Sequence, residues 1–206
     1  MSKTKILLIG AGGHASSCID LIEETGKFKI LGIIGTEFEI GNNILGYEVI
    51  GYDSEIEKFK SLTKEVVLGI GQIKSAETRI RIVGDLLSKG FNFHSVVSPH
   101  SCISKSTQVG VGTVVMHNAT INTGTNIGNY SIINSGAILE HGTSVGDYSH
   151  ISTGVILNGE SKIGNSTFIG SGSVIKEQVK IGNNCLVGMG QVVKNDLLDN
   201  TRYVGE

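Results

Sequence analysis

The amino-acid sequence predicts a two-domain protein: a small Rossmann-like parallel α/β domain over residues 1–97, then a parallel β-helix of hexapeptide repeats over residues 98–206. Three observations carry this prediction. Strand-like and helix-like patterns alternate in the first half. Aliphatic residues recur with an unbroken period of six in the second half. The chain has 29 glycines beside a single proline, and its high aliphatic content indicates regular turning rather than disorder.

The period of six runs from Ile103 to Val193, with an aliphatic residue at every sixth position and no insertion. A small side chain follows four residues later, from Thr107 to Cys185. One hexad corresponds to a short strand plus a corner, so three hexads return the chain to the same side, one strand spacing further along. We expect the aliphatic residues to fill the interior. Glycines also recur every 18 residues, where we expect corners with positive φ: Gly110, Gly128, Gly146, Gly164 and Gly182.

The first half alternates strand and helix patterns, which is typical of a small parallel sheet covered by helices. Strands are predicted at 5–10, 28–35, 65–71 and 91–97, and helices at 13–26, 53–61 and 75–90. Ser75 is the predicted cap of the last helix and Gly90 its predicted end. Asp53 or Ser54 is the predicted cap of the short one.

Gly10, Gly12 and Ala15 match the G-x-G-x-x-A pattern between a predicted strand and a predicted helix. Such a turn brings backbone N–H groups and a helix N-terminus towards a phosphate. A tight turn that needs glycine only for packing is the alternative. A NAD site would also require an acid at the end of the second strand. Residues 35–37 there read Gly-Thr-Glu, so we expect no NAD.

Composition excludes several other classes of protein. The formal net charge is −2, which indicates no broad attraction to nucleic acid. No apolar stretch approaches the roughly 18 residues of a spanning helix, so no membrane insertion is expected. Cys18, Cys102 and Cys185 are widely spaced and form no CxxC pair. We therefore expect neither a zinc site nor disulfides, and we expect a cytoplasmic protein.

Four segments together resemble the NeuD/PglD-like sugar acetyltransferases along nearly the whole chain. They are GAGGHA (10–15), GIGQIKSAETR (69–79), INSGAILEHGTSVGDYSHISTG (133–154) and IGNSTFIGSGSVI (163–175). The resemblance implies a nucleotide-sugar-binding α/β domain, a left-handed β-helix, a homotrimer and acetyl-CoA as co-substrate.

The same resemblance assigns roles to individual residues. His141 matches the catalytic base, and His150 matches a histidine that contacts the acetyl thioester. Cofactor-binding positions on the CoA side are, besides His150, Gly159, Ser171 and Met189. The nucleotide-sugar site is matched by Gly12, Gly13, His14, Gly35, Thr36, Glu37 and Gly71.

The surroundings of the histidines differ from the family pattern at one position and do not suggest a metal site. Many relatives place an acid directly after the base, whereas here Gly142 stands there. Glu140 precedes His141, but successive strand residues point to opposite sides. A metal is not expected, because His117, His141 and His150 lack the close histidine pair of zinc-binding β-helix enzymes.

The expected activity is acetyl-CoA-dependent N-acetylation of the 4-amino group of a nucleotide-linked 4-amino-4,6-dideoxy sugar, for surface glycan biosynthesis. Histidine suits the removal of a proton from the sugar amine. Direct attack on the thioester is favoured, because no Cys or Ser has a base partner visible in the sequence. A sialic acid or related nonulosonate O-acetyltransferase is one alternative. A non-catalytic nucleotide-sugar-binding β-helix protein is another.

His141 and His150 are nine residues apart, which is half of an 18-residue coil. They should therefore lie on different sides of the β-helix. If both serve one reaction, neighbouring subunits of the trimer must share the site.

Overall fold

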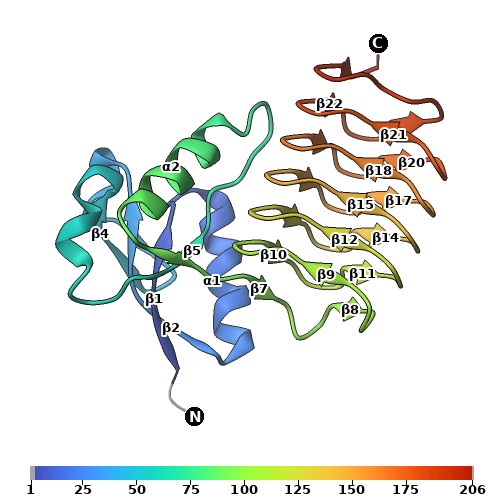
Figure 1. The fold of residues 1–206 in the computed structure, drawn as a ribbon. Coiled ribbons are helices and arrows are strands. Elements are labelled where there is room, and N and C mark those ends of the chain that lie inside the picture. The colour runs from blue at the N-terminus through green and yellow to red at the C-terminus, as the bar shows by residue number, and fades with distance from the viewer. Residues whose placement is uncertain (1–2, 206) are drawn as a thin grey trace. The chain divides into compact units, whose positions relative to one another are not determined.

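The computed structural model describes residues 3–205, which form two compact units (Figure 1). The N-terminal unit holds the residues up to Gly71 together with Thr78–Val96. The β-helix unit holds Gln72–Glu77 and the residues from Val97 onward. The short segment Gln72–Glu77 therefore belongs to the β-helix unit, although it precedes residue 97. The predicted fold class, an α/β unit followed by a left-handed parallel β-helix, is confirmed.

The N-terminal unit contains one six-stranded sheet in the order β3-β4-β2-β1-β5-β6. Its strands are β1 (Thr4–Ile9), β2 (Phe28–Gly35), β3 (Asn43–Ile44), β4 (Tyr47–Tyr52), β5 (Glu65–Leu68) and β6 (Asn92–Phe93). Its helices are α1 (Gly13–Thr25), α2 (Glu77–Ser88) and the 3₁₀ helices η1 (Glu37–Glu39) and η2 (Asp53–Phe59). The central strands bury consecutive residues, as in Ile6–Ile9 of β1, because helices cover both faces of such a sheet.

The sheet is mixed rather than purely parallel, which corrects the sequence prediction. Strand β3 pairs antiparallel with β4 at the edge, through a two-residue turn. Leu45 and Gly46 both have positive φ, as this kind of hairpin turn requires. Asn43 supports the turn, since its Oδ1 accepts a hydrogen bond from Gly46 N over 2.8 Å.

The predicted helices are present with small differences. Ser75 Oγ accepts a hydrogen bond from Glu77 N at the start of α2, and Gly90 follows its end with a φ of 74°. The segment predicted as a helix over 53–61 is the 3₁₀ helix η2 instead. Neither Asp53 nor Ser54 is its N-cap: Tyr52 occupies that position and makes no side-chain capping bond.

The β-helix unit repeats a two-residue strand every six residues. The strands are β7 (Val96–Val97), β8 (Cys102–Ile103), β9 (Gln108–Val109), β10 (Val114–Val115), β11 (Thr120–Ile121), β12 (Asn126–Ile127), β13 (Ile132–Ile133), β14 (Ile138–Leu139), β15 (Ser144–Val145), β16 (His150–Ile151), β17 (Ile156–Leu157), β18 (Lys162–Ile163), β19 (Phe168–Ile169), β20 (Val174–Ile175), β21 (Lys180–Ile181), β22 (Leu186–Val187), β23 (Val192–Val193) and β24 (Arg202–Tyr203).

These strands form three parallel sheets, one on each side of the coil. Sheet 1 runs β24-β22-β19-β16-β13-β10-β7, sheet 2 runs β23-β20-β17-β14-β11-β8, and sheet 3 runs β21-β18-β15-β12-β9. Partner residues in neighbouring strands from β8 to β23 lie 18 positions apart, as Val114 and Ile132 do, whereas Leu186 of β22 pairs with Arg202 of β24, 16 positions later. Three hexads therefore complete one coil, as the period of six predicts.

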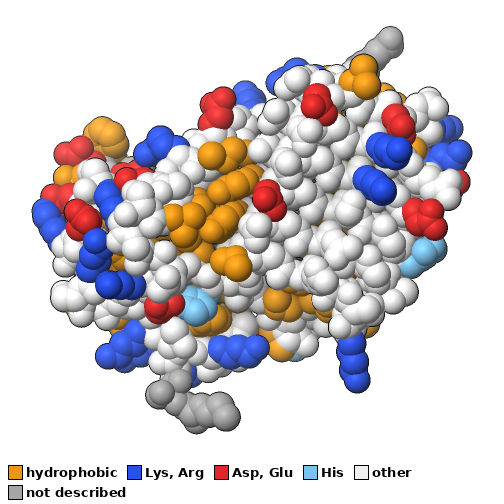
Figure 2. Space-filling model, viewed as in Figure 1, with side chains coloured by type: hydrophobic (Ala, Val, Ile, Leu, Met, Phe, Trp, Pro, Cys, Tyr) orange, Lys and Arg blue, Asp and Glu red, His pale blue; other side chains and the backbone are white. Residues whose placement is uncertain are grey.

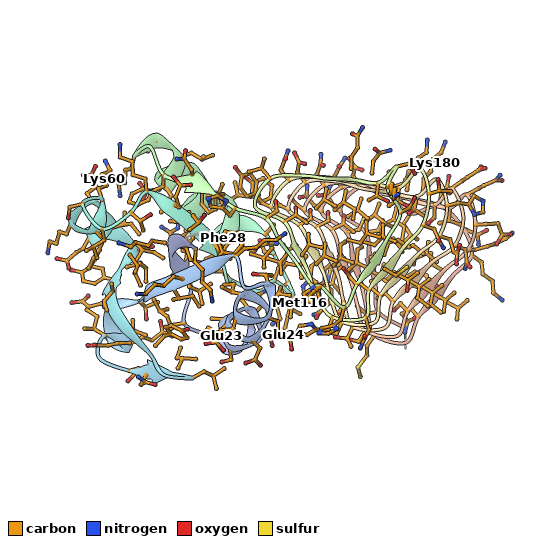
Figure 3. All side chains as sticks on the ribbon, turned by 90° about the horizontal axis from the view of Figure 1, so that it is seen from below. Glu23, Glu24, Phe28, Lys60, Met116 and Lys180 are labelled. Atoms are coloured by element: carbon orange, nitrogen blue, oxygen red, sulfur yellow. The ribbon has the colours of Figure 1, made fainter. Side chains whose placement is uncertain are left out.

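The second residue of each strand points inward and builds one continuous apolar core, from Ile103 to Val193. Side chains fill the space inside the stacked coils (Figure 3). The small hydroxyl residues of the repeat are also buried. Thr113 Oγ1 donates to Gly128 O over 2.8 Å, and Ser131 Oγ donates to Gly146 O over 2.8 Å. These bonds matter because burying a hydroxyl without a partner costs free energy.

The glycines that recur every 18 residues do not have the positive φ that the sequence suggested. They are needed for close approach between coils. A Cβ on Gly164 would lie 2.6 Å from the carbonyl carbon of Gly182 in the next coil. Positive φ instead recurs every six residues from Gly112 to Gly190. Several of those positions are not glycine, and Tyr130 and Tyr148 are among them.

Candidate functional site

Each coil has three corners, and residues 18 positions apart stack at the same corner. We call the corner between sheets 2 and 3 the histidine corner; its stacked residues are Thr123, His141, Gly159 and Glu177, followed one position later by Gly124, Gly142, Glu160 and Gln178. The corner between sheets 3 and 1 is the asparagine corner, with Asn129, Asp147, Asn165 and Asn183. The corner between sheets 1 and 2 is the serine corner, with His117, Ser135, Thr153, Ser171 and Met189.

His141 stands on the histidine corner two residues after β14, with an exposed side chain. Its ring lies against Gly159 in the next coil: a Cβ on Gly159 would be 2.6 Å from Cε1 and 2.8 Å from Nε2 of His141. Glu160 N donates to His141 O over 2.9 Å and fixes the register of the two coils. Gly159 therefore leaves the room that the imidazole occupies, while the ring stays open to solvent.

Three carboxylate residues lie at or next to the histidine corner in the sequence, and each has a different side-chain partner. Glu140 accepts a hydrogen bond from Asn122 Nδ2 over 2.8 Å, on the outer side of sheet 2. Glu160 accepts one from Gln178 Nε2 over 3.0 Å. Glu177 lies 3.8 Å from Lys176 Nζ at an exposed position.

His150 is the first residue of β16 in sheet 1 and is only 6% exposed. Its Nδ1 lies 2.7 Å from Gln72 O, a carbonyl that can only accept, so Nδ1 donates. Its Nε2 lies 3.2 Å from Asn134 Nδ2. The orientation of that amide is fixed, because Asn134 Oδ1 accepts from Ser135 N over 2.8 Å. Both ring nitrogens of His150 are therefore engaged, Nδ1 with a carbonyl oxygen and Nε2 with an amide group.

The structure thus separates the two predicted histidines, since His141 follows a strand of sheet 2 and His150 begins a strand of sheet 1. A hydrogen bond from His150 to a thioester would require one of its present bonds to break. That contact stays a prediction. Gln72, which accepts the hydrogen bond from His150 Nδ1, lies 78 positions away in the sequence. The sequence alone therefore does not reveal this hydrogen bond.

Ser171 and Met189 stack on the serine corner. Ser171 Oγ lies 2.8 Å from Ser152 Oγ, and the Met189 side chain is 81% exposed. His117 on the same corner is held at 2.8 Å by Ser98 Oγ. Of the predicted cofactor-binding residues, Gly159 therefore lies beside His141, while Ser171 and Met189 lie on another corner. Their contacts with CoA stay predictions.

The predicted substrate residues of the N-terminal unit gather at the carboxyl ends of β1, β2 and β5, where open α/β sheets bind ligands. Gly12 is the N-cap of α1, with no side-chain capping bond, and a Cβ on Gly12 or Gly13 would meet nothing within 4 Å. A Cβ on Gly35 would lie 3.0 Å from Ala11 Cβ. A Cβ on Gly71 would lie 3.3 Å from His14 Cβ.

An acidic residue that the sequence analysis did not select stands at this edge. Glu39 Oε2 accepts hydrogen bonds from both N and Oγ1 of Thr36, each over 2.8 Å. It would lie 2.8 Å from a Cβ on Gly35. Glu37, the predicted residue, is exposed. The spacing T-x-x-E is a capping-box signal that could have identified Glu39.

Charged side chains of both signs are interspersed over the visible face of the molecule (Figure 2). Within residues 3–205, no group of three or more His, Cys, Asp or Glu side chains could hold a metal ion. No helix in that range is long and apolar enough to cross a membrane.

Comparisons with known proteins agree with this architecture. Residues 5–86 match the family model of the PglD N-terminal domain. Residues 133–158 match the hexapeptide repeat of succinyl-transferase, and residues 160–195 match the bacterial transferase hexapeptide, with six repeats. None of the curated protein sequences compared with this chain matches it significantly.

Solved structures of two sugar acetyltransferases superpose on nearly the whole chain. One is a variant of perosamine N-acetyltransferase from Caulobacter crescentus in complex with CoA and GDP-perosamine. It is 26% identical, with a TM-score of 0.92 and coverage of 99% of this chain and 95% of that chain. A PglD N-terminal domain followed by hexapeptide repeats, together with this structure, supports the NeuD/PglD-like family of acetyl-CoA-dependent sugar acetyltransferases.

A second member of this kind is the acetyltransferase domain of PglB from Neisseria gonorrhoeae, in complex with acetyl coenzyme A. It is 25% identical, with a TM-score of 0.89, and covers 99% of this chain and 97% of that chain. WeeI from Acinetobacter baumannii is 20% identical with a TM-score of 0.61 and covers 98% of this chain and 97% of that chain, which shows the shared fold alone. The resemblance inferred from the four sequence segments is confirmed.

Proposed function

We propose that this protein transfers the acetyl group of acetyl-CoA to the 4-amino group of a nucleotide-linked 4-amino-4,6-dideoxy sugar, for surface glycan biosynthesis in the cytoplasm. The observation that carries the proposal is the exposed His141 imidazole, seated on Gly159 at a rigid corner of the β-helix. The complex of the perosamine N-acetyltransferase with CoA and GDP-perosamine supports this class of substrate.

In the proposed reaction, His141 takes a proton from the sugar amine as the nitrogen attacks the thioester carbonyl. The C–N bond forms, the C–S bond breaks, and the CoA thiolate leaves and takes up the proton from the imidazolium. Such general base assistance contributes roughly 100- to 10,000-fold. The open glycine turn before α1 would bind the phosphates of the sugar nucleotide through backbone N–H groups.

Burial makes two of the three thiols unsuited to carry an acyl group, whereas the third, Cys102, is exposed on β8. Burial raises the pKa of the Cys18 thiol to about 12. Burial also raises the pKa of Cys185. Only a thiolate is an effective nucleophile, so neither residue is suited to carry the acetyl group.

The active form we propose is a homotrimer whose neighbouring subunits share each site. The first residues of the last four strands in sheet 2, β14 to β23, face outward and place aliphatic side chains in one column, ending at Val192, which is 53% exposed. Packing of this column on a neighbour would form a heterologous interface that closes into a ring. The column consists of Ile138, Ile156, Val174 and Val192.

Subunit sharing can be tested by mixing inactive His141→Ala and His150→Ala chains under conditions of subunit exchange. If each site takes one histidine from each neighbour, a mixed trimer contains one site free of both changes and activity returns. Light scattering should show trimers throughout. If subunit exchange is verified and activity still does not return, the shared site is contradicted.

The activity itself can be tested by measuring thiol release from acetyl-CoA with GDP-, UDP-, dTDP- and CMP-linked sugars, with product mass as the second readout. We expect one acetyl group added to a 4-amino sugar nucleotide. Acetylation of a sialic acid hydroxyl instead would support the O-acetyltransferase alternative. Nucleotide-sugar binding without any thiol release would support the non-catalytic one.

A further inference from the structure

A base that must accept a proton at one imidazole nitrogen works best when a third group holds the proton on the other nitrogen. The residue after His141 is Gly142, which has no side chain to do this. Its φ is 68°, and the structure shows what occupies the space beside it. A Cβ on Gly142 would lie 3.3 Å from Glu160 Cγ. The side chain of Glu160 therefore lies where a residue-142 side chain would begin.

Glu160 is also tied to His141 through the backbone. Its N–H donates to His141 O over 2.9 Å, and the residue before it, Gly159, supports the imidazole ring. The carboxylate is oriented from the other side, because its Oε2 accepts a hydrogen bond from Gln178 Nε2 over 3.0 Å. One carboxylate oxygen is thus held by the coil above, and the other is available for the coil below.

We propose that Glu160 is the positioning residue of His141: its second carboxylate oxygen accepts the imidazole N–H and leaves the other ring nitrogen to take the proton of the amine. This inference rests on the proposed role of His141 as the base. The other nearby acids are less suited. Glu140 is held by Asn122 on the outer side of sheet 2, and Glu177 stands two coils away from His141, beside Lys176.

The test compares Glu160→Gln with the matched control Glu177→Gln, which removes an equal charge from an exposed position of the same corner. Nitrogen-15 NMR of the full-length protein reports which imidazole nitrogen of His141 carries the proton, and a His141→Asn sample assigns the signal. We expect one dominant tautomer in the unaltered protein and in Glu177→Gln. In Glu160→Gln the minor tautomer should increase at least threefold.

Kinetics give the second readout. We expect kcat to fall about tenfold or more in Glu160→Gln while KM for acetyl-CoA stays within twofold, because orientation of a general base affects the chemical step. An unchanged tautomer ratio in Glu160→Gln, or an equal effect of Glu177→Gln, would overturn the proposal. The NMR result is independent of turnover, so failure of the proposed acetyl transfer would appear separately, as no acetylation by the unaltered protein.

Discussion

The asparagine corner and the histidine corner both contain residues of positive φ, such as Tyr148 and Gly142, but their side-chain chemistry differs. At the asparagine corner each side chain serves the coil before it: Asn129 N donates to Asp147 Oδ1 over 2.7 Å, and Asp147 N donates to Asn165 Oδ1 over 2.8 Å. The histidine corner has no such repeated ladder, and its residue types change from coil to coil. The difference indicates that one corner stabilises the stack, whereas the other is free to carry chemistry.

Among changes that test the difference between the two corners, His141→Asn should have the largest effect on turnover. Turnover should fall at least 100-fold, because the proton acceptor is lost. The melting temperature should stay within a few degrees of the unaltered protein, since the imidazole is exposed. The matched change Asn129→Ala at the asparagine corner should do the opposite, with lower stability and nearly unchanged kcat. Turnover of His141→Asn within threefold of the unaltered protein would contradict the assignment.

A second pair of changes compares two glycines. In Gly159→Ala the three atoms nearest the new Cβ all belong to the His141 ring, a side chain that can move, so we expect about a tenfold loss of turnover with little loss of stability. In Gly164→Ala the new Cβ meets backbone at 2.6 Å, which cannot move cheaply. Overpacking of this kind costs about 1–3 kcal/mol. Denaturant unfolding and steady-state kinetics on both variants would test this, and equal stability losses would argue against it.

The smallest expected effect is a pH dependence at Asp199, which continues the ladder of the asparagine corner by accepting a hydrogen bond from Asn183 N over 2.8 Å. Hydrogen bonds from the backbone N–H and the side chain of Asn183 hold the pKa of Asp199 below its ordinary value. Stability from this lowered pKa is present above the ordinary Asp range and is lost as the pH falls through the lowered value. Melting curves between pH 2 and pH 7 should therefore drop on acidification, and less steeply in Asp199→Asn. Parallel curves for the two proteins would rule out this contribution.

The period of six was sufficient to predict every strand from β8 to β23, because a repeated aliphatic position can be buried only by stacking coils. Other features depended on contacts between distant segments. The edge hairpin at Asn43–Tyr52 was missed because its turn, Leu45-Gly46, lacks the usual Asn-Gly signal. The glycines that recur every 18 residues were predicted to have positive φ, which was wrong. They are needed for close approach between coils, and this requirement leaves no local pattern in the sequence.

The candidate site shows the same division. His141, Gly12 and Gly35 could be selected from motif and resemblance. The hydrogen bond between His150 and Gln72 joins residues 78 positions apart, and the placement of Glu160 beside Gly142 comes from the stacking of neighbouring coils. Neither contact leaves a local pattern in the sequence, whereas Glu39 could have been found from its T-x-x-E spacing to Thr36.

The 18-residue coil also sets how the distances within such a site can change during evolution. Insertion of one whole coil between two residues of the same corner would move them apart by one strand spacing, about 4.8 Å, without rotating either side chain. Insertion of a single residue would instead turn every later side chain towards another side. The gap between a base and a substrate-binding residue on one corner can therefore be lengthened only in whole steps, which favours adaptation to a longer substrate by duplication of a coil.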